Sequence, residues 1–292
     1  MRYAAIDIGS NAIRLLITEI IEAQPKDVFK KISLTRIPLR LGEEAFSNQE
    51  ISKKTAKSFT KCMKAFNYIM EASEVKDFRA CATSAMREAK NGNEIIALVK
   101  EKTGIQIEII SGTEEAGIIF SNFHLSEADK NKTYIYIDVG GGSTEVSLIK
   151  NNKRIASRSF KLGTVRILKG KVDPKLWEES KDWIKSHTQD EEEVIAIGTG
   201  GNINRIYKET RHQFDENISY SDIKQVIDFI GQYKYEERIQ KLKLKPDRAD
   251  VIIPAGKIYL HMMKSAFAHE MIVPKVGLSD GIIYNLYLKN KK

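Results

Sequence analysis

The chain has 292 residues, 42% hydrophobic and 29% charged, a composition typical of a globular protein rather than a disordered one. No run approaches the roughly 18 apolar residues that a membrane-spanning helix needs, and no basic and apolar leader precedes the first strand pattern. We therefore expect a cytoplasmic protein with no membrane partner, long enough for two domains.

The formal net charge is +8 and the pI is about 9.2, which favours an anionic substrate. The lysines are scattered, and the chain has no aromatic-and-basic ribonucleoprotein signature, no Cys/His finger and no clear helix-turn-helix. We therefore expect no nucleic acid partner. Cys62 and Cys81 follow neither metal nor redox spacing and are expected to be reduced thiols in or near the core.

The first half of the chain predicts a hairpin and then alternating helices and strands. Alternation predicts a strand over 3–8, and a β-branched run predicts a second strand over 12–20, after a Gly-Ser-Asn turn. Apolar residues at helical spacing predict a helix over 51–73. The other expected elements are a strand near 28–41, a strand over 77–83, a helix over 94–104 closed by Gly104, a strand over 105–110 and a helix that opens at 111.

The second half repeats this order. Its expected elements are strands over 134–139, 144–150 and 153–160, a helix over 176–188, a strand over 193–198, helices over 202–210 and 249–267, a strand near 271–277 and a closing helix over 279–290. Such alternation predicts two α/β domains, each with a mixed sheet flanked by helices. The polar segment Ser126–Lys132 is the expected hinge, which gives domains 1–125 and 126–292.

The two halves also share a sequence motif. YAAIDIGSNAIRLLI, from residue 3, aligns without a gap on YIYIDVGGGSTEVSL, from residue 134, with every position shifted by 131 residues (138 − 7). Because the aspartate, the glycine and the flanking apolar pattern all coincide, we interpret the chain as a duplicated domain.

A strand that ends in Asp-x-Gly suits a phosphate group. The small residues after the strand expose consecutive backbone N–H groups, and such a nest binds anionic oxygens. The aspartate, Asp7 or Asp138, is then placed to hold a divalent cation beside the phosphate. Two such hairpins on either side of a cleft would hold one phosphate group from both sides, an arrangement that we call the phosphate clamp.

The candidate phosphate ligands lie in and just after the two turns. Consecutive glycines are costly in chain entropy and are tolerated where a backbone must approach something closely. Glu145 stands where Arg14 stands in the first repeat and is expected to supply a second carboxylate to the cation. The expected phosphate ligands are Ser10, Asn11, Arg14, Gly140, Gly141, Gly142, Ser143 and Thr144.

A third glycine stretch, IGTGGN (197–202), lies between a predicted strand and a predicted helix. Gly200 and Gly201 could present N–H groups to an anion there, or they could simply make a tight connection. Ile203 excludes both the GxxxxGK[ST] loop and the GxGxxG dinucleotide fingerprint.

Two adjacent glutamates are candidates for activating water. Ser111 and Glu114 fit a capping box, in which Glu114 reaches back to the start of its helix. Glu115 is then free to act as a general base. Arg166 is a weaker candidate for substrate binding, and no histidine follows a ligand spacing.

These motifs resemble those of the exopolyphosphatase / guanosine pentaphosphate phosphohydrolase (Ppx/GppA) family of phosphatases, and the resemblance covers essentially the whole chain. The blocks that carry it are AIDIGSNAIRLLI, CATSAMREAKNG, IEIISGTEEAGIIF, YIDVGGGSTEVSLI, KLGTVRI, AIGTGGNINRI, RADVIIPAG and VGLSDGIIYNL. The resemblance implies two duplicated actin-like (ribonuclease H-like, ASKHA) α/β domains with an interdomain cleft. It also implies that Glu115 is the catalytic base, that Arg87 faces the substrate and that the chain forms a homodimer.

The sequence therefore predicts a Mg²⁺- or Mn²⁺-dependent exopolyphosphatase that releases orthophosphate from inorganic polyphosphate, with Asp138, Glu145 and Asp7 around the cation. The alternatives are the same reaction on the 5′-phosphate of guanosine pentaphosphate, an actin-like or Hsp70-like nucleotide sensor, and a basic scaffold that only binds polyphosphate. Longer family members carry an additional C-terminal helical domain, so this chain resembles the short form, and its chain-length preference stays open.

Overall fold

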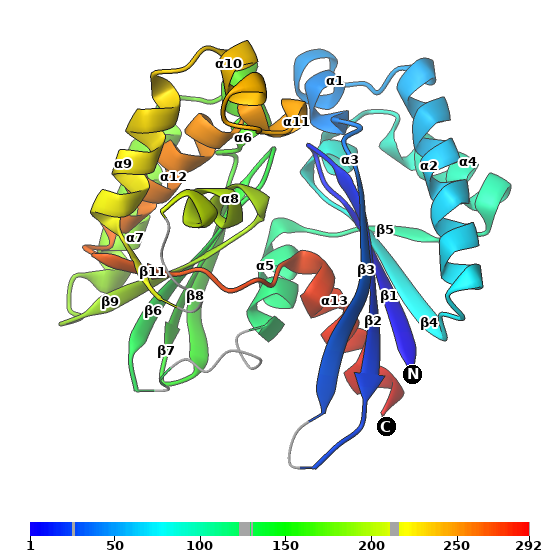
Figure 1. Ribbon diagram of the computed structural model, residues 1–292, viewed down its shortest axis with the longest axis horizontal. Coiled ribbons are helices and arrows are strands. Elements are labelled where there is room, and N and C mark those ends of the chain that lie inside the picture. The colour runs from blue at the N-terminus through cyan, green and yellow to red at the C-terminus, as the bar shows by residue number, and fades with distance from the viewer. Residues whose placement is uncertain (25–26, 123–128, 130, 211–215, 292) are drawn as a thin grey trace. The chain divides into compact units, whose positions relative to one another are not determined.

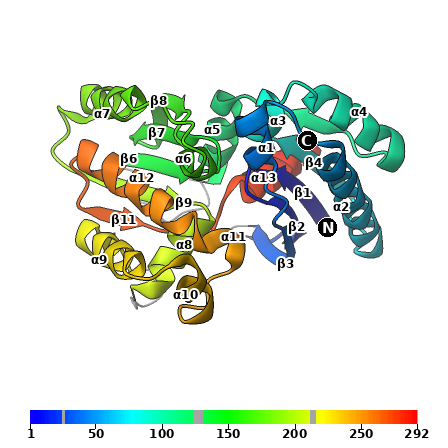
Figure 2. The same cartoon turned by 90° about the horizontal axis from the view of Figure 1, so that it is seen from above.

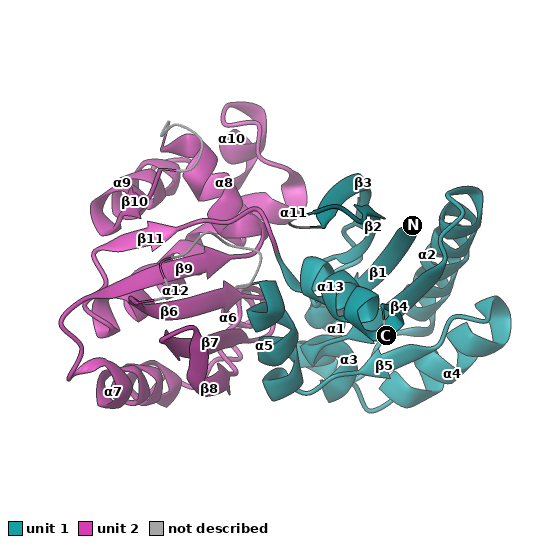
Figure 3. Cartoon of the chain, turned by 90° about the horizontal axis from the view of Figure 1, so that it is seen from below, with its two compact units in different colours: residues 1–122, 277–292 teal, residues 123–276 magenta. Residues whose placement is uncertain are grey.

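The computed structural model describes residues 1–24, 27–122, 129, 131–210 and 216–291. Its contacts divide the chain into two compact units, one made of residues 1–122 with 277–292 and the other of residues 123–276 (Figure 3).

The second expected domain, 126–292, is therefore corrected at its end. The last helix, α13 (Leu278–Asn290), packs on α5 (Gly112–Ser121) and on β1 (Arg2–Ile8) of the first unit, where its Ile282 and Ile283 are buried. Burial of this apolar face returns the chain to the first unit. Most of the expected hinge Ser126–Lys132 lies outside the described residues.

Within the described residues, the sheet of the first unit has five strands in the order β3-β2-β1-β4-β5 (Figure 1). Strands β1, β2 (Ile13–Ile21) and β3 (Val28–Ile37) are antiparallel neighbours. Strands β4 (Asp77–Ala82) and β5 (Ile107–Ile109) join in parallel. The carboxyl ends of β1, β4 and β5 therefore meet at one edge of the sheet, and the segments that follow them start there.

Helices cover both faces of this sheet. Figure 1 shows α13 and α2 (Lys53–Ala72) on opposite faces, and α2 packs against α4 (Gly92–Thr103). Helix α4 ends at Gly104, whose φ of 74° is the left-handed conformation that glycine adopts without strain, as predicted. Two short helices complete the unit: α1 (Leu41–Asn48), which the sequence reading missed, and α3 (Ser84–Glu88).

The second unit has the order β10-β11-β9-β6-β7-β8 in the described residues. Read from β8, the sequence β8-β7-β6-β9-β11 repeats β3-β2-β1-β4-β5, with the same antiparallel and parallel pairs. The predicted duplication is confirmed at the level of topology. The bounds are β6 (Thr133–Val139), β7 (Thr144–Lys150), β8 (Lys153–Phe160), β9 (Val194–Thr199), β10 (Ile218–Ser219) and β11 (Glu270–Ile272).

Helix α12 (Ile252–Ser265) is the centre of the second unit's helical layer. It packs against β6 and lies between α7 (Lys175–Thr188) and α9 (Tyr220–Gly231) (Figure 2). The remaining helices are α6 (Thr164–Leu168), α8 (Gly201–Glu209), α10 (Tyr235–Gln240) and α11 (Pro246–Ala249). In the described parts of the chain, no helix is both long and apolar enough to span a membrane.

Candidate active site

The turn of the first hairpin is held from behind by α1. It closes with a hydrogen bond from Gly9 N to Ala12 O (3.2 Å), and its Ser10 carbonyl accepts from Gly42 N of α1 (2.8 Å). The Asn11 carbonyl accepts from Arg40 N (3.2 Å). In a trans peptide the N–H points opposite to the preceding C=O. The N–H groups of Asn11 and Ala12 are therefore directed away from α1.

The second turn repeats this construction with α6 in place of α1. It closes with a hydrogen bond from Gly140 N to Ser143 O (2.9 Å). The Gly140 carbonyl accepts from Thr164 N (3.0 Å), and the Gly141 carbonyl accepts from Val165 N (2.8 Å). The buried Arg166, expected as a weaker candidate for substrate binding, instead donates from Nε to the carbonyl of Gly142 (2.9 Å) and so supports the turn from inside.

Because all three glycine carbonyls point toward α6, the N–H groups of Gly141, Gly142 and Ser143 point the other way. Three N–H groups in succession, directed to one side, form a nest for an anion. A fourth glycine, Gly163, lets the backbone before α6 approach the turn closely. A Cβ at Gly163 would lie 2.3 Å from the carbonyl carbon of Gly142 and 2.4 Å from the oxygen of Gly141.

The two helices that support the turns, α1 and α6, were not predicted, although the sequence carries a signal for them. Leu41-Gly42 are the first residues of α1, and Leu162-Gly163 come just before α6, each pair after the third strand of its repeat. Both leucines are buried, and a Cβ at Gly42 would lie 2.9 Å from the Cβ of Ser10. The Leu-Gly pair is thus a second internal repeat, which lets a helix approach the turn.

Two carboxylates lie opposite each other in the second hairpin. Asp138 on β6 pairs in register with Glu145 on β7. The hydroxyl of Thr199, at the end of β9, donates to Asp138 Oδ1 (2.5 Å). The hydroxyls of Ser143 (2.8 Å) and Ser159 (2.7 Å) donate to Glu145 Oε1. These donors fix the orientation of both carboxylates.

The first hairpin carries the opposite charge at one of these positions. Arg14 pairs in register with Asp7, and its Nη1 lies 2.6 Å from Asp7 Oδ2. The Asp7 side chain is 4% exposed and that of Arg14 is 32% exposed, so the carboxylate is covered and its charge is compensated. Cys81 on β4 occupies the place that Thr199 has in the second unit. The first hairpin is therefore less suited to a cation than the second.

The donor set of the second hairpin fits Mg²⁺ or Mn²⁺. Among the residues described, no three His, Cys, Asp or Glu side chains form a group that could hold a metal. Mg²⁺ is usually bound by one or two carboxylates together with substrate phosphates and water, rather than by an all-protein cage. Asp138 and Glu145 supply those two carboxylates, next to the nest of N–H groups.

The IGTGGN stretch lies beside the same aspartate. Gly200 has a φ of 105°, a backbone conformation that favours glycine, and a Cβ placed there would lie in ordinary van der Waals contact, 3.5 Å from Asp138 Oδ1. Gly201, the first residue of α8, is covered by the guanidinium of Arg248, whose Nη2 would lie 2.7 Å from a Cβ at Gly201. Arg248 is the first residue of the family block RADVIIPAG, but the sequence analysis did not predict it as a site residue.

Glu115 lies in α5, which starts at the carboxyl edge of the first sheet, and only 7% of the residue is exposed. The expected capping box is half correct, because Ser111 Oγ accepts from Glu114 N (3.1 Å). The carboxylate of Glu114 instead binds Arg79 Nη2 (2.7 Å), which also binds Glu108. Glu114 has a structural partner, as predicted, but a different one, and Glu115 is the buried member of the pair.

Several expected phosphate ligands are corrected in detail. The hydroxyl of Thr144, fully buried, donates to the carbonyl of Leu162 (2.5 Å) and cannot face a ligand. The buried Ser10 hydroxyl is 2.9 Å from that of Ser84, so it ties the turn to α3.

Other side chains are partly engaged within the protein. Arg87 donates from Nη1 to the carbonyl of Ile110 (2.5 Å), just before the cap of α5. The side-chain oxygen of Asn11 accepts from Arg40 Nε (3.2 Å). At the turns themselves, backbone N–H groups rather than hydroxyls are therefore the donors available to a phosphate.

The sequence profile of the Ppx/GppA phosphatase family matches residues 17–290. A bifunctional 3-dehydroquinate synthase/phosphatase of Fusobacterium nucleatum is 31% identical over 294 residues, which cover 92% of this chain and 44% of that protein. This chain therefore spans less than half of that relative. Exopolyphosphatase 1 of Mycobacterium leprae is 23% identical over 303 residues, 97% of this chain and 88% of that one.

A solved exopolyphosphatase structure from Cytophaga hutchinsonii matches with a TM-score of 0.86 at 20% identity, covering 99% of this chain and 98% of that one. At this identity the match establishes the fold alone. The two-unit α/β architecture is shared over the whole length of both chains.

Proposed function

The chain belongs to the Ppx/GppA phosphatase family, and from that premise we propose that it is an exopolyphosphatase, which removes terminal orthophosphate from inorganic polyphosphate. The observation that carries the proposal is the second hairpin, where three N–H groups directed to one side adjoin two oriented carboxylates. The N–H nest suits the terminal phosphoryl oxygens, and Asp138 with Glu145 suits a divalent cation.

The reaction needs little covalent chemistry from the protein. The oxygen of water attacks the terminal phosphorus, the phosphoanhydride P–O bond breaks, and the shortened chain leaves with the bridging oxygen. Glu115 accepts the proton of the attacking water, a role for which its place after the carboxyl edge of the sheet suits it. The N–H nest, with Arg248 nearby at the N-terminus of α8, stabilises the charge on the phosphoryl oxygens.

A bound Mg²⁺ or Mn²⁺ would neutralise charge on the phosphate oxygens. In this proposal Asp138 and Glu145 hold it, with Thr199, Ser143 and Ser159 keeping the carboxylates oriented. Asp7 is left out of the cation's ligands, because the guanidinium of Arg14 already compensates its charge.

The nearest second candidate is hydrolysis of the 5′-phosphate of guanosine pentaphosphate, the other activity for which the family is named. The phosphoryl chemistry is the same, so the site residues proposed above do not separate the two substrates. Phosphate release from polyphosphates of several lengths and from guanosine pentaphosphate, measured side by side with Mg²⁺, decides between them. Negligible release from both would contradict the enzyme proposal, and saturable ATP binding in its place would favour a nucleotide sensor.

The proposal requires both units to act on one substrate molecule, as the expected interdomain cleft implies. Small-angle scattering with and without a non-hydrolysable polyphosphate analogue tests it, since compaction is expected and identical profiles would count against it. A homodimer and a cytoplasmic location complete the proposal, and light scattering of the purified protein and cell fractionation test them.

A further inference from the structure

One helix of the first unit carries a stripe of exposed lysines. Successive residues of an α-helix are rotated by about 100°, so Lys57, Lys61, Lys64 and Tyr68 fall within an arc of about 60°. All four are exposed, Tyr68 at 68%. We call these four residues the lysine stripe. Lys53 and Lys54 extend it into the first turn of α2.

Some helical lysines of this chain are ion-paired, and within the described residues the lysines of the stripe are not. Lys181 and Lys224 each bind an acidic residue three or four positions away on their own helix. In contrast, no carboxylate oxygen of the described residues lies within 4.0 Å of Lys57, Lys61 or Lys64, and the only acidic residue of α2 is Glu71 near its end. Like charges one turn apart repel each other, and an external polyanion would remove that repulsion.

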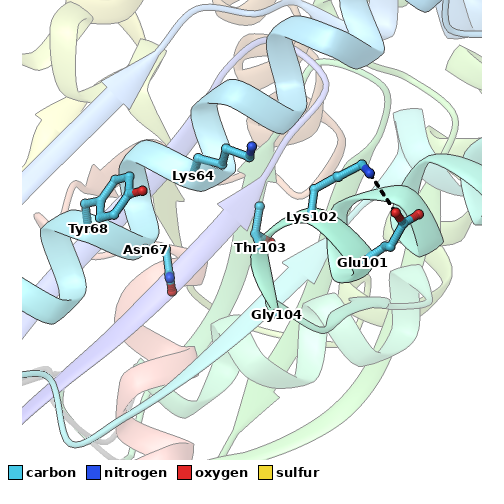
Figure 4. A pocket seen from close by; sticks show the side chains of 7 residues that line it. All are labelled: Lys64, Asn67, Tyr68, Glu101, Lys102, Thr103 and Gly104. Atoms are coloured by element: carbon cyan, nitrogen blue, oxygen red, sulfur yellow. Dashed lines mark hydrogen bonds and ion pairs between the residues drawn. The ribbon is translucent and has the colours of Figure 1, made fainter.

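The stripe leads into a groove between α2 and the end of α4. Figure 4 shows the groove, a cavity of about 270 Å³ that Lys64, Asn67 and Tyr68 line from α2. Lys102 and Thr103 line it from α4, together with Glu101, whose carboxylate is 2.7 Å from the Lys102 ammonium. The ammonium of Lys64, the hydroxyl of Tyr68 and the amide of Asn67 are therefore the donors that α2 brings to the far end of the stripe.

The near end of the stripe is tied to the first hairpin turn. Glu44 of α1 accepts from Ser52 N (2.6 Å) and from Thr55 Oγ1 (2.7 Å) at the start of α2. Gly42 of α1 donates to the Ser10 carbonyl in the turn. Helix α2 is thus linked to the turn through α1, and at 1.5 Å per residue the stripe extends along α2 for about 16 Å.

We propose that the lysine stripe is a second binding site for inorganic polyphosphate, which holds the part of the chain distant from the phosphate being cleaved. This inference rests on the proposed function. A flexible chain with a charge on every phosphate matches a row of lysines on a solvent-exposed face, and binding is driven by release of its counterions. Single-stranded nucleic acid is less well matched, because its bases need aromatic platforms and the stripe offers only Tyr68.

The test compares K57Q/K61Q/K64Q with the control K175Q/K257Q/K289Q, which neutralises three exposed lysines on α7, α12 and α13. For a polyphosphate many tens of phosphates long, we expect the stripe variant to raise KM about tenfold at low salt and to keep kcat. Tripolyphosphate, too short to reach along the stripe, should keep both constants. The control should match the parent for both substrates.

Binding of fluorescent long-chain polyphosphate, measured by anisotropy in the Glu115→Gln background, gives a readout independent of turnover. The plot of log affinity against log salt has a negative slope, and in the stripe variant its steepness should decrease by about 2, roughly 0.7 for each lysine removed. Equal binding and equal KM in the stripe and control variants would overturn the inference, as would an equal rise in KM for tripolyphosphate.

Competition with single-stranded DNA of the same charge distinguishes the two polyanions. The inference requires long polyphosphate to bind the parent protein more tightly than the DNA does. It would be overturned, in favour of a nucleic acid surface, if the DNA bound equally well and its affinity fell by the same factor in the stripe variant. If the parent protein releases no phosphate from any substrate, the proposed function fails, and the binding measurements still decide whether the stripe holds polyphosphate.

Discussion

The two hairpins of this chain have the same backbone and different charges. Each turn closes with one hydrogen bond across it, each is backed by a short helix with a Leu-Gly pair at its start, and each aspartate lies next to the first parallel strand of its sheet. Yet Asp7 lies opposite Arg14, whereas Asp138 lies opposite Glu145.

The difference teaches how a duplicated unit can divide its work. An internal ion pair makes the first hairpin nearly neutral, so in our proposal it contributes backbone N–H groups and the partly exposed guanidinium of Arg14. In the same proposal the two carboxylates of the second hairpin hold the cation. The first unit contributes Glu115, the proposed general base, and the sequence predicts no general base among the described residues of the second unit.

The largest expected effect separates two adjacent side chains of the first unit. Glu115→Gln should lower kcat by about 10²- to 10⁴-fold, the usual contribution of a general base, with substrate binding kept. Glu114→Gln is the matched control, because its carboxylate binds Arg79 at the surface, and kcat should stay within about twofold. Phosphate-release kinetics check both variants, and equal activity of the two would remove Glu115 from the mechanism.

A glycine of the second unit gives the next effect. Gly163→Ala places a methyl group within 2.5 Å of the Gly141-Gly142 backbone, which must move away from α6 and tilt the N–H nest. We expect about 1–3 kcal/mol of lost stability and a clear loss of kcat/KM. Gly231→Ala, at the end of α9 with nothing within 4 Å, should leave both unchanged. Denaturant unfolding and kinetics of the two variants decide whether close backing of the turn matters.

A smaller effect is expected at Thr199, which positions Asp138 through a hydrogen bond. Thr199→Val should raise the Mg²⁺ concentration needed for half-maximal activity about tenfold, as expected for the loss of an outer-shell hydrogen bond. Thr199→Ser, which keeps the hydroxyl, should need the same Mg²⁺ concentration as the parent protein. A valine variant with unchanged metal dependence would show that Asp138 needs no such support.

The smallest effect concerns the equivalent position of the first unit. Burial raises the pKa of Cys81 from its ordinary value of 9.0 to about 12, so the thiol beside Asp7 stays neutral in the folded chain. Burial of the neutral thiol contributes fully to the free energy of unfolding below pH 9. This contribution is lost as the pH rises toward 12, because the thiol of the unfolded chain ionises first. Iodoacetamide at pH 8.5 should modify native Cys81 far more slowly than the unfolded chain, and equal rates would contradict the burial of this thiol.

Sequence reasoning found the parts of this site that local patterns encode. The Asp-x-Gly hairpins were predicted because strand alternation and small turn residues are local signals, and the capping position of Ser111 was predicted for the same reason. The roles of Arg166 and Thr144 depend on neighbours more than fifteen residues away in sequence, which a local pattern does not contain. The return of α13 to the first unit was missed because the partners of its apolar face, α5 and β1, lie far earlier in the sequence, and a local pattern does not contain them.

The division of charge between the hairpins is tested most directly by Mn²⁺ binding, followed by electron paramagnetic resonance in the presence of orthophosphate. We expect Asp138→Asn to weaken Mn²⁺ binding by at least tenfold, and Asp7→Asn, which removes a carboxylate already paired with Arg14, to change it by less than about twofold. Equal losses in the two variants, or a larger loss in Asp7→Asn, would contradict the assignment of the cation to the second hairpin.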